Sequence, residues 1–254
     1  MPPLTDLTRH LDRLLEASAF RDYGPNGLQV PGQTQVQTVI TGVSAHVPFL
    51  ERAAEEGADL VLVHHGLFWR GQPLEITAGM HRRLKLLFDH DMALAAYHLP
   101  LDAHPEHGNN ALIAEGLGGE DPQPFAEHEG RAIGVRVRFG GDGLTIGELA
   151  SRVRDLVGGR EPLVVPAGPE RIRTLGIVSG GGTDYVHDAV ALGLDAFLTG
   201  EPSERAFGIA HDDRIHFLAA GHHATETFGV RRLGELLERE FGVRHVFVDV
   251  PNPI

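Results

Sequence analysis

Two adjacent histidines, His64 and His65, follow a run of four apolar residues, LVLV at 60–63. A run of this length and β-branched content is typical of a strand that is buried on both faces in the middle of an α/β sheet. Ligands of open α/β sheets bind at the carboxyl ends of such strands. Two neighbouring imidazoles at that edge could each bind a different metal ion, although a lone His-His pair is more often a pair of hydrogen-bonded structural residues.

More polar side chains follow the next apolar run, MALAAY at 92–97, which ends in HLPLDAH. If the two strands are parallel, His98, Asp102 and His104 are expected at the same edge of the sheet as the first pair of histidines. Pro100 is expected to prevent a regular helix between His98 and Asp102, so that this segment forms a loop over the cleft.

A third group follows the strand expected at 215–218, in the motif GHHATE. His222 and Glu226 are four residues apart at the start of an expected helix, so one helical turn places them on the same face, whereas His223 points elsewhere. The inventory of candidate ligands is then three imidazoles and two carboxylates, namely His64, His65, Asp102, His222 and Glu226. Such a set is sufficient for two metal ions that share a carboxylate and a water or hydroxide.

Composition excludes several other kinds of chemistry. The chain has 254 residues and no cysteine, so disulfides, thiolate zinc sites, iron-sulfur clusters and a cysteine nucleophile are excluded, and a hydrolytic metal site is favoured over a structural one. The net charge of -13 argues against a nucleic acid as the main partner. The only lysine, Lys85, does not stand in a phosphate-binding loop. With neither a signal peptide nor an apolar run long enough for a membrane span, we expect a cytoplasmic protein with no membrane partner.

Strand-like and helix-like segments alternate along the chain, which predicts the α/β class with parallel strands joined by right-handed crossovers. The polar, Pro- and Gly-rich segment 118–130 is expected to lead into a second domain, and 22–32 to be a plain connecting loop. We therefore expect two interlinked α/β domains whose central sheets are flanked by helices. Residues 1–127 together with 219–254 would form the metal-site domain, and 128–218 a smaller one.

Two other motifs are weak. The turn SGGGT at 179–183 has backbone N–H groups that could bind an anion, but it lacks a lysine and a GxGxxG pattern, and a tight turn without a ligand is an equally good interpretation. Ser44 lies in a motif close to a nucleophile elbow. His46 stands where the second glycine is required, so Ser44 is expected to be a capping residue.

The chain resembles a known family in six segments that follow one another in order. They are NGLQV at 26–30, VHHGLFW at 63–69, HLPLD at 98–102, TGE at 199–201, GHHATE at 221–226 and the Asn252-Pro253 pair. The HHGLFW and GHHATE blocks together are a specific signature of the Nif-three-like proteins, catalogued as GTP cyclohydrolase 1 type 2 homologues. Leu99 and Pro100 depart from the family pattern, which commonly has polar residues there, and this leaves the orientation of Asp102 open.

The resemblance implies a two-domain α/β protein with a dinuclear metal centre, assembled into a ring-like homohexamer. The family's metal-binding positions correspond here to His64, His65, Asp102, His222 and Glu226, with Glu226 as the bridging ligand. The sequence does not distinguish zinc, iron, manganese, nickel and magnesium.

The leading functional hypothesis is a metal-dependent hydrolase, of the cyclohydrolase or phosphoesterase type, that acts on a small molecule. A hydroxide held between two divalent ions would be the nucleophile. His98, His104 and His223 are candidates for proton transfer, although each is more often a supporting or surface residue, and no catalytic residue is assigned. The alternatives are a metal-binding or metal-delivery protein and a protein-interaction module, both without turnover.

Overall fold

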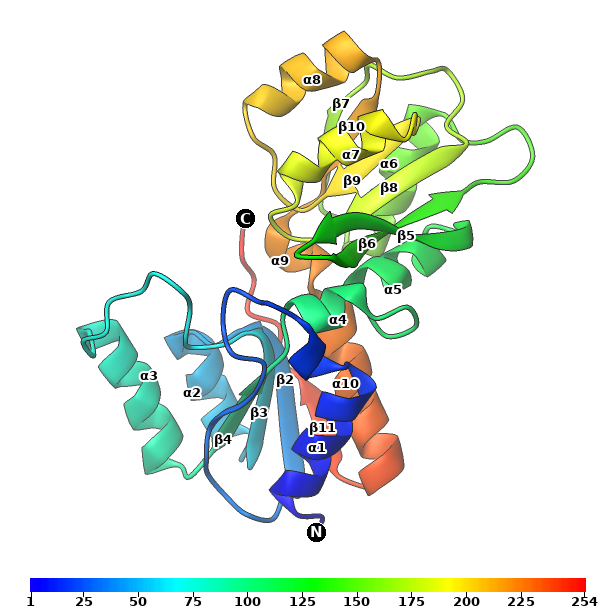
Figure 1. Cartoon of the computed structure of the whole chain (residues 1–254). Coiled ribbons are helices and arrows are strands. Elements are labelled where there is room, and N and C mark those ends of the chain that lie inside the picture. The colour runs from blue at the N-terminus through cyan, green and yellow to red at the C-terminus, as the bar shows by residue number, and fades with distance from the viewer. The chain divides into compact units, whose positions relative to one another are not determined.

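The computed structural model describes all 254 residues, and the chain folds into two compact units (Figure 1). The first unit contains Met1–Leu101 and Gly229–Pro251, and the second contains Asp102–Phe228 and Asn252–Ile254. Each unit has one β-sheet with helices packed on it, so the predicted α/β class with two sheets is confirmed. The boundaries between the units follow residues 101 and 228. The sequence predicted domain boundaries near residues 127 and 219.

The first unit has a five-stranded sheet in the order β1-β4-β3-β2-β11. The strands are β1 (Gly27–Val30), β2 (Thr38–Ser44), β3 (Leu60–His65), β4 (Ala93–Ala96) and β11 (Arg244–Phe247). All neighbouring pairs are parallel except β1 with β4. The helices are α1 (Leu4–Leu14), α2 (Val47–Glu55), α3 (Ala78–Asp89) and α10 (Thr227–Phe241), and a short 3-10 turn η1 (Ala17–Ala19) follows α1. The strand that carries His64 and His65 is therefore central, as predicted.

Helices cover both faces of this sheet, and the side chains of β3 alternate between the two apolar layers that result. Leu60 and Leu62 pack in the layer formed with α1 and α10, and Val61 and Val63 pack in the layer formed with α2 and α3. All four side chains are fully buried. A strand that is fixed from both sides holds the residues at its carboxyl end in a defined position.

The second unit has a six-stranded sheet in the order β5-β6-β8-β9-β10-β7. The strands are β5 (Glu120–His128), β6 (Arg131–Arg138), β7 (Leu163–Val165), β8 (Thr174–Val178), β9 (Ala196–Thr199) and β10 (His216–Ala219). Only β8, β9 and β10 form parallel pairs. The helical segments are α5 (Asn109–Gly116), α6 (Ile146–Leu156), η2 (Thr183–Tyr185), α7 (Val186–Ala191), α8 (Arg205–Asp213) and α9 (His222–Thr225). The short helix α4 (Leu99–Ala103) contains the boundary between the two units.

Two expectations about local structure are wrong. Pro100 does not prevent a helix, because it lies in the first turn of α4, where the missing N–H has no helical partner in any case. The segment 118–130 does not lead into the second unit but lies inside it, because most of it is strand β5, which pairs with β6 as a hairpin. Its first five residues are exposed and include two prolines, which an edge strand tolerates, so the segment lacks the alternation of a half-buried strand.

Three other elements were not predicted as such. Strand β1 lies within the segment 22–32 that was expected to be a connecting loop, and helix α8 was not foreseen. The expected helix from His222 is interrupted at Glu226, which separates α9 from α10. None of the helices combines the length and the apolarity that crossing a bilayer requires.

Candidate metal centre

Three histidines meet at the carboxyl edge of the sheet in the first unit. His64 and His65 end β3, and His98 follows the parallel neighbour β4. The ring centroids are 4.8 Å apart for His64 and His65, 4.9 Å for His64 and His98, and 5.5 Å for His65 and His98. One ring nitrogen from each lies within 4.8 Å of the others, so the group could hold a metal ion. The parallel strands thus bring together the three histidines that follow them, as predicted.

Hydrogen bonds at Nδ1 orient the two histidines of β3. Nδ1 of His64 lies 2.9 Å from the carbonyl oxygen of Tyr97. Since a carbonyl oxygen can only accept, Nδ1 carries the proton and the lone pair of a neutral ring lies on Nε2. Nδ1 of His65 lies 3.0 Å from Oγ of Ser44, at the end of the neighbouring strand β2. Both contacts hold the Nδ1 side of the ring, as is common for metal-binding histidines.

His98 is held by a buried carboxylate, that of Asp22, whose Oδ1 accepts from Nδ1 at 2.7 Å. The same carboxylate accepts from the backbone N–H groups of Tyr23 at 2.6 Å and Leu99 at 2.9 Å and from Nδ2 of Asn26 at 2.9 Å. Burial raises the pKa of Asp22, but His98 and the other donors lower it to about 2. The segment expected to be a plain connector therefore supplies an ionised group that positions a histidine.

The turn after β3 is fixed by Gln29. Its Oε1 accepts from the backbone N–H of Leu67 at 2.8 Å, and its Nε2 donates to the carbonyl oxygen of Pro25 at 2.7 Å. The amide occupies the space that a Cβ atom on Gly66 would need. Nε1 of Trp69 donates to the carbonyl oxygen of Gly66 at 3.2 Å, which closes the turn.

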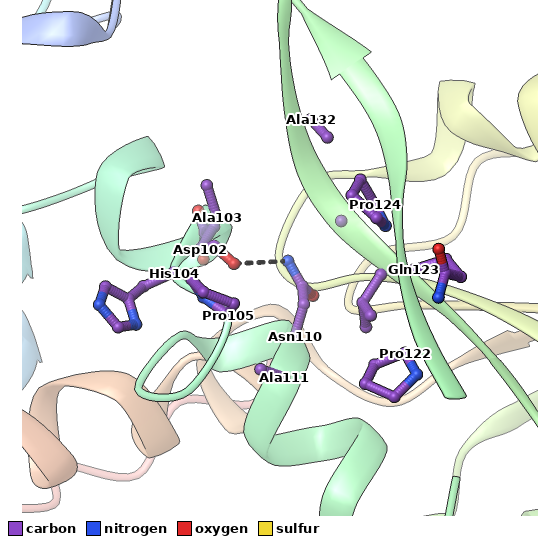
Figure 2. Close-up of a pocket in the computed structure, with 12 residues that line it drawn as sticks. Asp102, Ala103, His104, Pro105, Asn110, Ala111, Pro122, Gln123, Pro124 and Ala132 are labelled. Atoms are coloured by element: carbon purple, nitrogen blue, oxygen red, sulfur yellow. Dashed lines mark hydrogen bonds between the residues drawn. The ribbon is translucent and has the colours of Figure 1, made fainter. Parts of the chain in front are cut away.

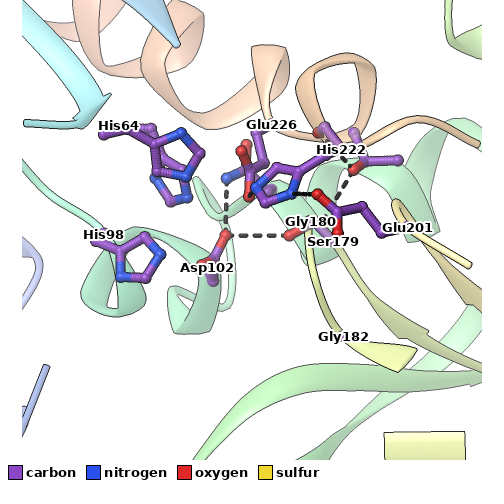
Figure 3. Close-up of polar contacts among 12 residues, drawn as sticks. His64, His98, Asp102, Ser179, Gly180, Gly182, Glu201, His222 and Glu226 are labelled. Carbon is purple, nitrogen blue, oxygen red and sulfur yellow. Dashed lines mark hydrogen bonds and ion pairs between the residues drawn. The ribbon is translucent and has the colours of Figure 1, made fainter. Parts of the chain in front are cut away.

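In the second unit, Asp102 in α4 is buried and lies close to the end of β8. Its Oδ1 accepts from Nδ2 of Asn109 at 2.8 Å and from Oγ of Ser179 at 3.1 Å (Figure 3). These two donors orient the carboxylate. They provide the polar support that the apolar Leu99 and Pro100 do not.

Asn110 connects three backbone groups beneath Asp102. Its Nδ2 donates to the carbonyl oxygen of Asp102 at 3.3 Å (Figure 2). The same nitrogen donates to the carbonyl oxygen of Ile133 at 2.7 Å, and Oδ1 accepts from the N–H of Ser179 at 2.7 Å. The side chain is only 1% exposed. This amide therefore joins α4 to β6 and to the end of β8. Its role was not predicted from the sequence.

His222 and Glu226 form a close pair even though the helix breaks between them. Nε2 of His222 lies 3.0 Å from Oε1 of Glu226, and Nδ1 lies 2.5 Å from Oε1 of Glu201 (Figure 3). Burial lowers the pKa of His222, but the two carboxylates raise it to about 9. The predicted proximity of His222 and Glu226 is thus observed. The role of Glu201, which contacts the other nitrogen of the ring, was not predicted.

The turn at 179–183 supports this pair and does not form an anion site. The N–H of Gly180 donates to Oγ1 of Thr225 at 3.0 Å, and that of Gly182 donates to Oγ1 of Thr199 at 3.1 Å. With the N–H of Ser179 bound to Asn110, three donors of the turn are used within the protein. The anion-binding interpretation is therefore not supported.

A family model described as Duf34/NIF3 (NGG1p interacting factor 3) matches residues 2–253. The chain belongs to this family. It is 45% identical over 250 residues to the GTP cyclohydrolase 1 type 2 homolog of Pseudomonas aeruginosa, with 98% of each chain covered. Two similar solved structures cover all of both chains, namely the protein ybgI of unknown function, with a TM-score of 0.93 and 40% identity, and TTHA1606 from Thermus thermophilus, with a TM-score of 0.91 and 37% identity. The predicted family is confirmed.

In this Duf34/NIF3 chain the donor atoms suit divalent cations. The candidate ligands are imidazole nitrogens and carboxylate oxygens, which bind zinc and the neighbouring transition metals, and oxygen donors alone also suit magnesium and manganese. The imidazoles of His64 and His222 each have an oxygen acceptor at Nδ1, as metal-binding histidines usually do. The residues therefore fit a divalent metal ion.

The two remaining candidate histidines have other contacts. His104 stacks on His107 with ring centroids 4.8 Å apart, and its Nδ1 accepts from the N–H groups of Glu106 and His107. It lines a cavity of about 290 Å³ together with Asp102 and the prolines of β5 (Figure 2). His223 is buried, and its backbone N–H donates to the carbonyl oxygen of Ile254. A role for either ring in proton transfer stays a prediction.

Proposed function

We propose that this protein binds two divalent metal ions and hydrolyses a small molecule with them. The proposed ligands are His64, His65, Asp102, His222 and Glu226, with Glu226 shared by both ions. The observation that carries the proposal is the pair of His222 with Glu226 at 3.0 Å, held from its far side by Glu201. A carboxylate that accepts from the ring nitrogen that does not bind the metal is a usual support of a metal-binding imidazole.

When bound, a pair of divalent ions would lower the pKa of water and stabilise negative charge on substrate oxygens. The protein would supply the orientation. Asn109 and Ser179 fix the carboxylate of Asp102, and Tyr97 fixes the tautomer of His64. Since the proposed ligands are set by hydrogen bonds made within the protein, little rearrangement would be needed when the ions bind.

The substrate class follows from the same chemistry. The name that the relatives carry, GTP cyclohydrolase 1 type 2 homolog, supports a cyclic amide or a nucleotide, and a phosphate ester would use the same ions. The cavity beside Asp102 has both apolar and polar walls, including Pro122, Gln123 and Pro124, and could accept part of such a molecule. Assembly into a homohexamer is part of this proposal and can be tested by light scattering of the purified protein.

The decisive experiment measures bound metal and turnover together. Apo-protein is loaded with zinc, manganese, iron, nickel or magnesium, dialysed and analysed for metal, and each form is incubated with a panel of nucleotides, cyclic amides and phosphoesters. Glu226→Ala is expected to lose metal and activity, whereas Glu204→Ala, at an exposed carboxylate, should retain both. Unchanged metal content in Glu226→Ala would contradict the proposal. Full metal content without turnover of any substrate would favour a metal-delivery protein.

A further inference from the structure

We infer that the cavity beside Asp102 binds the uncharged ring of a cyclic amide and does not bind a phosphate group. The cavity has a volume of about 290 Å³ and lies within the second unit, where α4, α5 and the hairpin of β5 and β6 supply its walls (Figure 2). This inference rests on the proposed function, from whose substrate classes it selects one. Binding of the ring can nevertheless be measured without metal and without turnover.

The first argument is the room that small residues leave. Four positions on the walls carry alanine or glycine and therefore take up little space, namely Ala103, Ala111, Ala132 and Gly134. The volume of about 290 Å³ lies at the lower end of the range for ligand-binding cavities, which is about 300–1,000 Å³. The cavity therefore suits one ring system of a substrate and is too small for a whole nucleotide.

The second argument is the chemistry of the walls. Pro105, Pro122 and Pro124 contribute apolar rings to the cavity. A proline side chain has almost no conformational freedom to lose when a ligand packs against it. Asp102 and His104 supply polar groups at the α4 side of the cavity. Rigid apolar walls with a few polar groups at one side fit a ring that carries an amide at one edge.

The third argument is charge. No lysine or arginine lines the cavity, whereas phosphate groups are usually bound by these two residues. The first turn of α5 contributes a partial positive charge, but the carboxylate of Asp102 accepts from Asn109 in that turn and offsets it. A phosphate in the cavity would thus lie near a carboxylate with no cationic side chain to balance the charges. An uncharged ring would not be repelled.

The fourth argument is a bulge in the wall that β5 forms. Between the pairs Glu120–Arg138 and Gln123–Arg136, β5 has one residue more than β6. Asp121 lies in this bulge with a φ of 51°, in the left-handed region that residues other than glycine seldom adopt. Bulges re-aim the neighbouring side chains and are common next to active sites. This one lies directly beside the two prolines that β5 contributes to the cavity.

The position of the polar groups sets the orientation of the ring. Its amide edge would lie toward Asp102, a proposed metal ligand, and the rest of the ring would pack among the prolines. Ring opening would break the amide C–N bond and consume one water molecule. The hydroxyl of that water goes to the carbonyl carbon and its proton goes to the nitrogen. The hairpin would thus select the substrate, and the proposed metal ligands would serve the hydrolysis.

The test measures binding to the full chain in EDTA, so that no phosphate can bind through a metal ion. Isothermal titration uses two uncharged cyclic amides, dihydrouracil and hypoxanthine, and two anions, methyl phosphate and inorganic phosphate. Both amides should bind at least about tenfold more tightly than the anions. Ala111→Phe, which fills the cavity from α5, should weaken amide binding by at least about tenfold. Ala191→Phe, at an exposed alanine that ends α7, is the control and should bind like the wild type.

Thermal unfolding shows whether each variant folds. If Ala111→Phe does not, Pro122→Ala removes part of an exposed wall residue and should weaken amide binding by about tenfold.

The outcomes separate this inference from the proposed function. Absence of amide binding, equal amide affinity in the cavity variants and the wild type, or tighter binding of the anions would overturn the inference. Each of these results would leave the proposed metal binding and hydrolysis standing. A protein that binds no metal but binds the amides in this cavity would refute the proposed function and leave the ring site in place.

Discussion

Gly180 lies against the carboxylate of Glu226, with no room for a side chain between them. A Cβ atom on Gly180 would collide with Oε1 of Glu226 and would lie 3.0 Å from Nε2 of His222. The residue also has a φ of 61°, in the left-handed region that glycine adopts at little cost. The glycine at this position therefore permits the approach of the pair to the end of β8.

Replacing Gly180 by alanine should displace Glu226 and weaken metal binding by at least about tenfold, with a loss of stability of about 1–3 kcal/mol from backbone strain. Isothermal titration with Zn²⁺ and urea unfolding measure the two effects. Gly181→Ala is a matched control one residue away, because its Cβ atom would have no neighbour closer than 3.9 Å and its φ is not positive. Equal metal affinity in both variants would contradict this account.

Glu201 should support metal binding without contacting the metal. Glu201→Gln keeps the size of the side chain but removes the charge that helps to raise the pKa of His222 to about 9. We expect this pKa to fall and the affinity for metal to decrease by about 10- to 100-fold, since a carboxylate makes the imidazole a better donor. NMR titration of the apo-protein reports the pKa, and metal titration reports the affinity. Glu204→Gln, at an exposed position nearby, should leave both unchanged.

Asn110 should contribute to stability and to the position of Asp102. Asn110→Ala removes the partner of three backbone groups, of which the N–H of Ser179 and the carbonyl oxygen of Ile133 lie at 2.7 Å. Leaving buried polar groups without partners costs about 1–3 kcal/mol for each group. We expect a loss of stability of about that size or larger, measured by urea unfolding. Gln123→Ala, at an exposed residue of β5, is the control, and an equally small loss in both variants would refute the prediction.

His245 should make the protein less stable in mild acid. Burial and Arg231 lower the pKa of this histidine below its ordinary value of 6.5, although Glu238 and Glu235 oppose the shift. The unfolded chain then binds a proton at a higher pH than the folded chain. The contribution of His245 to the free energy of unfolding is therefore fully present above pH 6.5. It is lost as the pH falls through the folded-state pKa.

Substitution of His245 by glutamine should reduce this acid sensitivity, even if it lowers stability at neutral pH through the loss of the contact with Thr41. Urea unfolding of both proteins at about pH 7.5 and about pH 5 measures the difference. His90→Gln serves as the comparison at an exposed site. An unchanged pH dependence in His245→Gln would show that another group is responsible.

Sequence patterns predicted the elements in which buried residues follow one another without interruption or recur at a regular spacing. The apolar run at 60–63 indicated a central strand because both of its faces are covered, and the period of apolar residues indicated α6 and α10. The hairpin strand β5 had no such pattern, since its first five residues are exposed and its pairing with β6 is made by backbone groups. Pairing of this kind leaves little trace in side-chain type.

The candidate ligands were predictable because histidine and carboxylate follow strands in recognisable motifs. Most of the residues that hold them were not, because they come from distant parts of the chain. Asp22 reaches His98 across 76 positions, and Ser179 reaches Asp102 across 77. A hydrogen bond over such a separation depends on the folded topology. Asp22 and Glu201 are ordinary acidic residues in the sequence and acquire their role only through the rings that they contact.

The contact between Gln29 and Gly66 means that these two positions cannot change independently. The amide of Gln29 fills the space beside Gly66, so any larger residue at 66 would displace it and release the N–H of Leu67. A library that randomises position 66 alone should return glycine almost exclusively. A second library that carries serine at position 29 should also return alanine at position 66. We expect positions 29 and 66 to covary in this way among distant relatives.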